Sequence, residues 1–297
     1  MTWIISALAF SFFSSLTMLV NQEFKVNGRL LSGLRGIGVG LVFMPLMFFV
    51  ELPTSPLFWT FIALEVIIST FFSQKLFEAS AKYGAGATSI TMVLSVAFGV
   101  VLWWIVDYRG FLELISDPLK LTGILVSLLF IAIGFYFVER KEIDKSIKQL
   151  RFMMPAVILL ALIMINRKEI MEHSDFYSAT VYYCTISIFG SGVINMIWYL
   201  KSKERQNDYP IRKKTLIKAT IYITIASGLM IFTGNLSSLK APNPAYVSAL
   251  SLTSPIWIFL INRARNIKMY LNFKAMIILL IALASLVYFA NSPIHPA

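Results

Sequence analysis

The chain has 297 residues, of which 58% are hydrophobic and 14% are charged, and its formal net charge is +11. Soluble globular proteins carry roughly 25% charged residues, so a water-soluble fold of this length could not bury so much apolar surface. A basic charge suits nucleic acid in a soluble protein, but Lys and Arg also gather in the cytoplasmic loops of membrane proteins. We therefore expect membrane lipid as a partner and no nucleic acid.

Ten stretches of the chain are almost free of charge, and nearly all charged residues fall between them. About 20 apolar residues in a helix cross a hydrocarbon core of roughly 30 Å. The runs are continuous rather than alternating, which predicts helices and not barrel strands. The predicted spans are 2–20, 31–50, 58–77, 87–106, 119–138, 152–166, 176–200, 216–239, 244–261 and 273–289. The sequence thus predicts an all-α, multi-pass protein of the cell or inner membrane with ten transmembrane helices.

The fourth and ninth spans resemble each other. Residues 83–95 can be aligned with residues 242–254, which pairs Ser95 with Ser254. Each half would contain five spans. Because this number is odd, a duplicated second half must enter the membrane from the opposite side. We predict two inverted five-helix repeats, at 1–148 and 149–297, an arrangement typical of secondary transporters.

Basic residues are distributed unevenly between the two sides of the predicted topology. All but five of the 26 Lys and Arg residues fall in the connections after the odd-numbered spans. The five on the other side are Arg109, Lys120, Arg167, Lys168 and Lys240. With ten spans, the positive-inside rule places both termini outside the cytoplasm.

Some of these tracts also carry a family resemblance. The features that carry it are Arg35 early in the second span, the tract 83–95, and the tract 243–255 with its Thr253-Ser254-Pro255 ending. Through these features the chain resembles the ten-span, EamA-type branch of the drug/metabolite transporter superfamily. The first half departs from the family pattern, with Val96 at the register position of the proline. The resemblance implies a helical carrier of small metabolites or amphipathic compounds. It also implies cytoplasmic termini, opposite to the charge distribution, and both orientations stay open.

Glu65 is the only acidic residue near the middle of a predicted span. A charged carboxylate there is costly unless it is protonated, paired or facing water. Three interpretations follow: proton coupling, a counter-charge for a cationic substrate group, or a protonated side chain hydrogen-bonded within the bundle. We expect Arg35, by contrast, to extend to the aqueous boundary, with pairing to a substrate carboxylate as the alternative.

Hydroxyl and amide side chains within the spans are the other candidates for a polar site. Helical spacing places Thr88, Thr91 and Ser95 on one face of the fourth span. A similar stripe on the ninth contains Ser248, Ser251 and Ser254, and further candidates are Ser11, Ser14 and Asn235. These groups could line a substrate cavity, or they could bond to nearby carbonyls and neighbouring helices. Pro255 lacks a backbone donor and is expected to bend the ninth span, with a gating role as one possibility.

The predicted function is secondary transport of small metabolites, amino acids or amphipathic compounds by alternating access, with proton coupling as one option. Substrate is expected among spans one, three, four, six, eight and nine. The alternatives are a non-transporting membrane scaffold and a channel. The two histidines lie outside the spans, Cys184 is the single cysteine and no P-loop is present, so we expect no enzyme activity, cofactor or metal. Substrate identity, direction and oligomeric state stay open.

Overall fold

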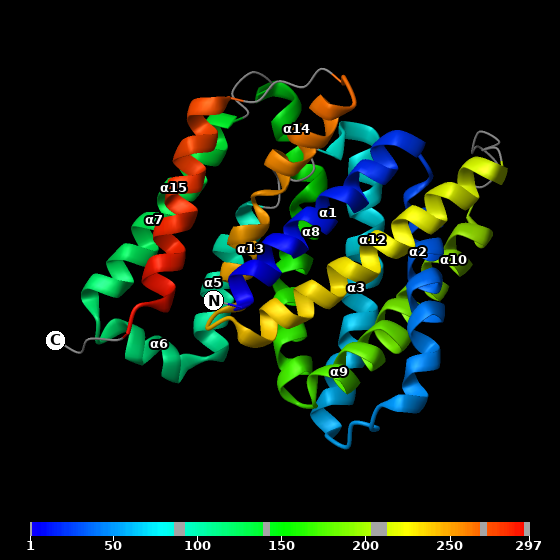
Figure 1. The fold of residues 1–297 in the computed structure, drawn as a ribbon, viewed down its shortest axis with the longest axis horizontal. Helices are drawn as coiled ribbons and strands as arrows, with labels where there is room; N and C mark the ends of the chain where they lie inside the picture. The colour runs from blue at the N-terminus through cyan, green and yellow to red at the C-terminus, as the bar shows by residue number, and fades with distance from the viewer. Residues whose placement is uncertain (1, 86–92, 139–142, 203–212, 268–271, 294–297) are drawn as a thin grey trace.

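The structure is a computed structural model that describes residues 2–85, 93–138, 143–202, 213–267 and 272–293. Every regular element in these ranges is helical, and Figure 1 shows their arrangement. The first half contains α1 (Thr2–Phe24), α2 (Gly28–Phe43), η1 (Met44–Phe49), α3 (Pro56–Tyr83), α5 (Val93–Val106), α6 (Tyr108–Ile115) and α7 (Pro118–Val138). The second contains α8 (Ile143–Glu172), α9 (Phe176–Tyr182), η3 (Tyr183–Ile188), α10 (Phe189–Lys201), α12 (Lys213–Lys240), α13 (Pro244–Ser251), α14 (Ser254–Ala264) and α15 (Phe273–Asn291).

Within the described residues, seven helical segments are long and apolar enough to cross a membrane. An eighth is added if Ser95–Val106 and Tyr108–Ile115, which meet at 101°, are counted as one bent span. Large apolar side chains such as Phe48 and Ile281 are 89% and 65% exposed, which suits contact with lipid. The prediction of an all-α membrane protein is confirmed at this level. Each predicted span coincides with helix where it is described, apart from residue 50 and the turn at 252–253, but ten crossings stay a prediction.

Three local features differ from the predicted spans. The sixth predicted stretch, 152–166, is part of a longer helix, α8, which ends at Glu172. The ninth is broken between α13 and α14. A short additional helix, α6, follows the fourth and is capped by the carboxylate of Asp107, which accepts a hydrogen bond from the Gly110 N–H at 3.1 Å. Hydropathy misses such features because it reports apolar length and not where backbone hydrogen bonds begin and end.

Local sequence signals explain several helix ends. The side-chain oxygen of Asn27 accepts from the N–H of Arg29 at 2.9 Å and so begins α2. Asn243 begins α13 in the same way through the N–H of Ala245. At the end of α3, Gly84 has φ of +88°, a conformation that a residue without Cβ adopts at little cost. These caps satisfy backbone groups that a helix end leaves without a partner.

The most extensive helix contacts join the two halves of the chain. α1 packs on α12, α3 on α8, α2 on α10, and α7 on α15. In Figure 1, α7 and α15 form a pair at the left, beside the bundle that contains the other three pairs. The bundle interior is therefore built from both halves together.

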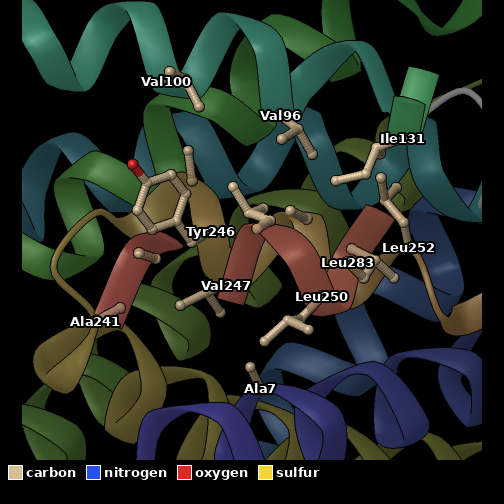
Figure 2. Packing of buried hydrophobic residues seen from close by; sticks show 14 of the residues in the cluster. Ala7, Val96, Val100, Ile131, Ala241, Tyr246, Val247, Leu250, Leu252 and Leu283 are labelled. Atoms are coloured by element: carbon tan, nitrogen blue, oxygen red, sulfur yellow. The ribbon is translucent and has the colours of Figure 1, made fainter. Parts of the chain in front are cut away.

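The largest apolar cluster lies where α13 packs between α5 and α1. Figure 2 shows Val96 and Val100 of α5 on one side of α13 and Ala7 of α1 on the other. Tyr246 and Leu250 of α13 belong to the same cluster, and all five residues are buried. This packing holds the helix that carries the predicted serine stripe against two helices of the first half.

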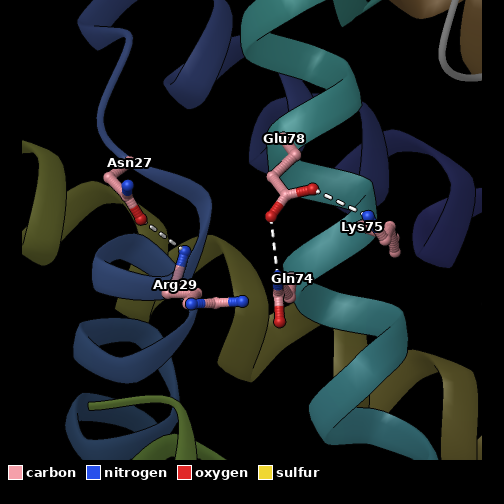
Figure 3. Close-up of polar contacts among 5 residues, drawn as sticks. All are labelled: Asn27, Arg29, Gln74, Lys75 and Glu78. Carbon is pink, nitrogen blue, oxygen red and sulfur yellow. Dashed lines mark hydrogen bonds and ion pairs between the residues drawn. The ribbon is translucent and has the colours of Figure 1, made fainter. Parts of the chain in front are cut away.

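The N-terminus of α2 is packed closely on α3. Figure 3 shows Glu78 of α3 accepting hydrogen bonds from Gln74 at 2.7 Å and Lys75 at 3.1 Å, beside the cap of α2. A Cβ on Gly28 would lie 2.9 Å from the backbone nitrogen of Glu78. The absence of a side chain at Gly28 thus permits the close approach of the two helices.

Candidate functional site

A polar cavity lies in the bundle, with walls from α1, α2, α3, α8, η3, α12, α13 and α14. The empty space between its walls, including a part that is open to solvent, is about 930 Å³. The centres of water molecules can occupy about 80 Å³ of it. That is room for several waters. This set differs from the predicted set of spans: α2 and η3, from the second and seventh stretches, contribute to the walls, and the described part of the fourth stretch, α5, does not.

Glu65 projects from α3 into the cavity wall and is fully buried. The Tyr183 hydroxyl donates a hydrogen bond to its Oε1 at 2.6 Å, and the Asn166 amide donates to its Oε2 at 2.8 Å. Both carboxylate oxygens therefore accept from protein donors. This pattern suits an ionised carboxylate, which must replace lost water contacts by hydrogen bonds.

Arg167 of α8 is joined to Glu65 through a phenol. Its Nη2 donates to the Tyr183 hydroxyl at 3.3 Å, and the same hydroxyl donates to Glu65. The guanidinium also lies over two aromatic rings, with its Cζ 5.7 Å from the ring centre of Phe10 and 5.6 Å from that of Tyr183. Opposite charges on α8 and α3 are thus placed in one buried network, which offsets part of the cost of removing each from water.

Arg35 supplies a second buried cation from α2. Its Nη1 donates to the Ser73 hydroxyl at 3.0 Å, and its Cζ lies 5.8 Å from the Phe77 ring centre. The side chain is 7% exposed and lines the cavity. The prediction that Arg35 extends to the aqueous boundary is therefore wrong: serine and aromatic partners on α3 hold it inside.

The prediction that Arg167 and Lys168 lie in a connection is also wrong, because α8 continues through both. Lys168 is buried, donates to the Ala241 carbonyl at 2.8 Å and pairs with Glu172 at 3.1 Å. Two of the five basic residues assigned to the less basic side are thus helix residues with protein partners.

A segment of π-helix positions the tyrosine of this network. Tyr183 is the first residue of η3, which interrupts the α-helical segments α9 and α10. π segments are rare and often occur at functional sites, since the wider turn changes the direction of the following side chains. Here the Tyr183 hydroxyl reaches both Glu65 and Arg167. Sequence analysis missed Tyr183, because no composition signal marks a π segment.

Four of the predicted hydroxyl residues line the cavity: Ser14 of α1, Ser248 and Ser251 of α13, and Ser254 of α14. The Ser251 hydroxyl also donates to the Ser248 carbonyl at 2.7 Å, and the Ser248 hydroxyl contacts the sulfur of Met164. The two interpretations of the serine stripe therefore hold together on α13, because a hydroxyl that bonds to its own helix can still face the cavity.

Other predicted site residues do not line the cavity. Asn235 is buried and donates to the Thr180 hydroxyl at 3.3 Å, and Ser95 is buried but does not line the cavity. Thr88 and Thr91 lie outside the described residues. The structure thus brings only part of the predicted polar set together.

Ser11 and Pro255 take part in one structural device. Pro255 has no N–H to donate to the Ser251 carbonyl four residues earlier. The hydroxyls of Ser11 and Ser254 donate to that carbonyl instead, at 3.2 and 2.7 Å. The predicted interruption occurs immediately before Pro255, which lies in the first turn of α14. Ser11 therefore connects α1 to the break in the ninth stretch and does not line the cavity.

Comparisons with known proteins bear on the fold alone. No family model matches the chain, and no curated protein matches it. Solved structures do match, among them one described only as "Crystal structure of protein". That match has a TM-score of 0.65 at 13% sequence identity, and it covers 97% of this chain and 94% of the other. The whole described architecture therefore follows a known fold.

Proposed function

We propose that this protein is a secondary transporter that binds a small molecule in the central cavity and moves it by alternating access. The observation that carries the proposal is a cavity with room for several waters and three buried charged side chains in its wall, set in a bundle that exposes many large apolar side chains. A charge inside a membrane bundle is costly and typically marks a substrate or ion pathway. A scaffold assembled only for partner binding has no need of such a cavity.

The pairing of helices supports two inverted repeats. If the halves are equivalent, α1 corresponds to α8 and α3 to α12, so exchanging the halves converts the α1–α12 contact into the α8–α3 contact. Both contacts occur and both are extensive. The same exchange of halves leaves three other contacts unchanged, namely α2–α10, α5–α13 and α7–α15. A pseudo-two-fold relation between five-helix halves accounts for this pattern, and an odd number of spans makes the halves inverted.

The cavity lies where alternating access requires a binding site. Its walls combine Ser14 and Glu65 from the first half with Arg167 and Ser248 from the second. Movement of one half against the other would therefore open one side of the site and close the other without dismantling either half. Membership of the EamA-type transporters is part of this proposal, supported by the resemblance of the tracts 83–95 and 243–255.

Glu65 is the residue proposed to couple transport to protons. It is the acidic member of the cavity wall, and its two hydrogen-bond partners come from α8 and η3 in the other half. A change in its charge would alter contacts between the halves. Any rearrangement that separates Glu65 from Tyr183 would favour protonation, because the carboxylate would lose a donor.

Transport can be tested with the full chain in proteoliposomes. Uptake of radiolabelled organic acids, amino acids and cationic amphiphiles is followed over time, and protein-free liposomes provide the background. We expect uptake of at least one class to saturate with concentration and to be inhibited by its unlabelled form. Flux that rises without saturation would assign the protein to channels, and the absence of flux for every class would contradict the proposal.

A further inference from the structure

The cavity has an excess of positive charge. Its charged wall residues, among those the structure describes, are Arg35, Arg167 and Glu65. When Glu65 is ionised, as its two donors favour, one positive charge is left unbalanced by the wall. In a low-dielectric interior such a charge attracts an anion more strongly than it would in water. The earlier interpretation of Glu65 as the counter-charge for a cationic substrate does not fit, since two arginines would repel that cation.

Both arginines retain an unused donor. The Nε atoms of Arg35 and Arg167 are buried and have no hydrogen-bond partner. The side chains are only 7% and 8% exposed, so open solvent does not satisfy these groups. A buried donor without an acceptor costs free energy, and a guanidinium offers its donors as a planar fork that fits a carboxylate. Two such groups from different helices line one cavity.

We propose that the cavity binds a small monocarboxylate anion through the guanidinium groups of Arg35 and Arg167. The single negative charge of such an anion balances the net positive charge that the two arginines and ionised Glu65 give the site. A phosphate monoester carries about −1.5 to −2 charge at neutral pH and would leave the site negative. A zwitterion would leave it positive. The apolar side chains of Phe72 and Leu160 on the wall suit the hydrocarbon part of the ligand.

The inference rests on the proposed transport function for its meaning as a substrate site, but binding is measurable without transport. The probes are acetate, lactate, pyruvate, butyrate and benzoate, with lactamide, butyramide and benzamide as uncharged matches of similar shape. Thermal unfolding of the purified full-length protein in detergent is recorded against probe concentration. We expect at least one acid to raise the unfolding temperature in a saturable manner and its amide to leave it unchanged.

Variants assign the effect to the two arginines. Arg35→Gln and Arg167→Gln should each raise the apparent Kd by about tenfold or more, since each removes charge-assisted hydrogen bonds. The matched control is Arg263→Gln, which changes an exposed arginine of α14 outside the cavity wall. Where a glutamine variant fails to fold, the acid–amide comparison on the wild-type protein still decides. Equal stabilisation by acid and amide, stabilisation by no acid, or unchanged binding in both folded cavity variants would overturn the inference.

Proteoliposome flux separates this inference from the transport proposal. Arg-dependent binding of an acid without flux of any compound would contradict transport and uphold the carboxylate site. Saturable flux of a neutral or cationic compound that persists in Arg35→Gln and Arg167→Gln would uphold transport and contradict the carboxylate site. Saturable uptake of an acid that both variants abolish would support both.

Discussion

Replacing Gly36 by Ala tests the close crossing of α2 and α10. At this crossing α2 lies against α10 with no side chain between the two backbones. A Cβ built on Gly36 would lie 2.5 Å from both the Gly192 Cα and the Ile188 carbonyl oxygen. Ordinary contacts begin at 3.4 Å, so the helices must separate locally by about 1 Å. Both obstructing atoms belong to backbone, so no rotation of a side chain can relieve the overlap.

We expect Gly36→Ala to lower the free energy of unfolding by about 1–3 kcal/mol, the cost of overpacking a close-packed interior. Small residues at membrane helix crossings permit backbone contact, and most of that contact would be lost. The measurement is equilibrium unfolding of the purified protein in mixed SDS and dodecyl maltoside micelles. Gly192→Ala should have a similar effect, because its Cβ would lie 2.7 Å from the Gly36 Cα.

The matched control is Gly190→Ala, on α10 like Gly192. Its Cβ would meet the Val66 methyl carbons at 3.4 and 3.5 Å, which is ordinary van der Waals contact. We expect a change of less than about 0.5 kcal/mol, or a small stabilisation from the better helix propensity of alanine. The double variant at Gly36 and Gly192 should cost less than the sum of the single variants, because one separation of the helices accommodates both methyl groups. If Gly36→Ala were as stable as Gly190→Ala, the inferred crossing would be wrong.

Three further changes test the site and its surroundings. Glu65→Gln should abolish transport or remove its pH dependence while leaving expression intact; unchanged uptake with an unchanged pH profile would exclude Glu65 from the mechanism. The second change is made in a Cys184→Ala background, which removes the native thiol. There Ser14→Cys should react with a sulfonate-bearing thiol reagent and Ser11→Cys should not, because Ser14 lines the cavity and Ser11, on the same helix, does not. Equal labelling rates would contradict this assignment. At the N-cap of α9, burial raises the pKa of Asp175, but hydrogen bonds from Ser178 and the N–H of Tyr177 outweigh it and lower the pKa overall. The cap therefore stabilises the fold above the ordinary carboxyl pKa and loses that contribution as pH falls through the lower folded value. Asp175→Ala should cost about 1 kcal/mol near neutral pH and much less in acid, as measured by thermal unfolding across pH; a cost that does not depend on pH would contradict the assigned ionised cap.

Some parts of the site could be predicted from the sequence because each is a property of a single segment. An acidic residue in an apolar run stands out, so Glu65 was found. Ser248 and Ser251 followed from helical spacing, and Ser14 followed from a cluster of serines in an apolar run. The position of the helix break followed from Pro255, since a missing N–H always frees the carbonyl four residues earlier. The hydroxyl of Ser11 that satisfies this carbonyl could not be foreseen, because it comes from a helix 240 residues away in the chain.

The two arginines show where reasoning along one segment ends. Arg167 follows the last apolar residues of its stretch, so hydropathy alone ends the span before it. If the helix is extended to Glu172, Ile163, Arg167 and Ile170 fall on one face, and this pattern favours burial of Arg167. Even so, the hydrogen-bond partner of Arg167 is a phenol on η3, and the acid that this phenol joins to it lies on α3, in the other half of the chain.

The sequence by itself determined the solvent of this protein and the positions of most of its helices, because apolar length and charge are sums along a single stretch of chain. Tertiary structure alone decided that Arg35, Glu65 and Arg167 share one cavity. A charge is tolerated in a membrane bundle only through partners that meet it from other helices, and their meeting depends on crossings as close as that of Gly36 and Gly192.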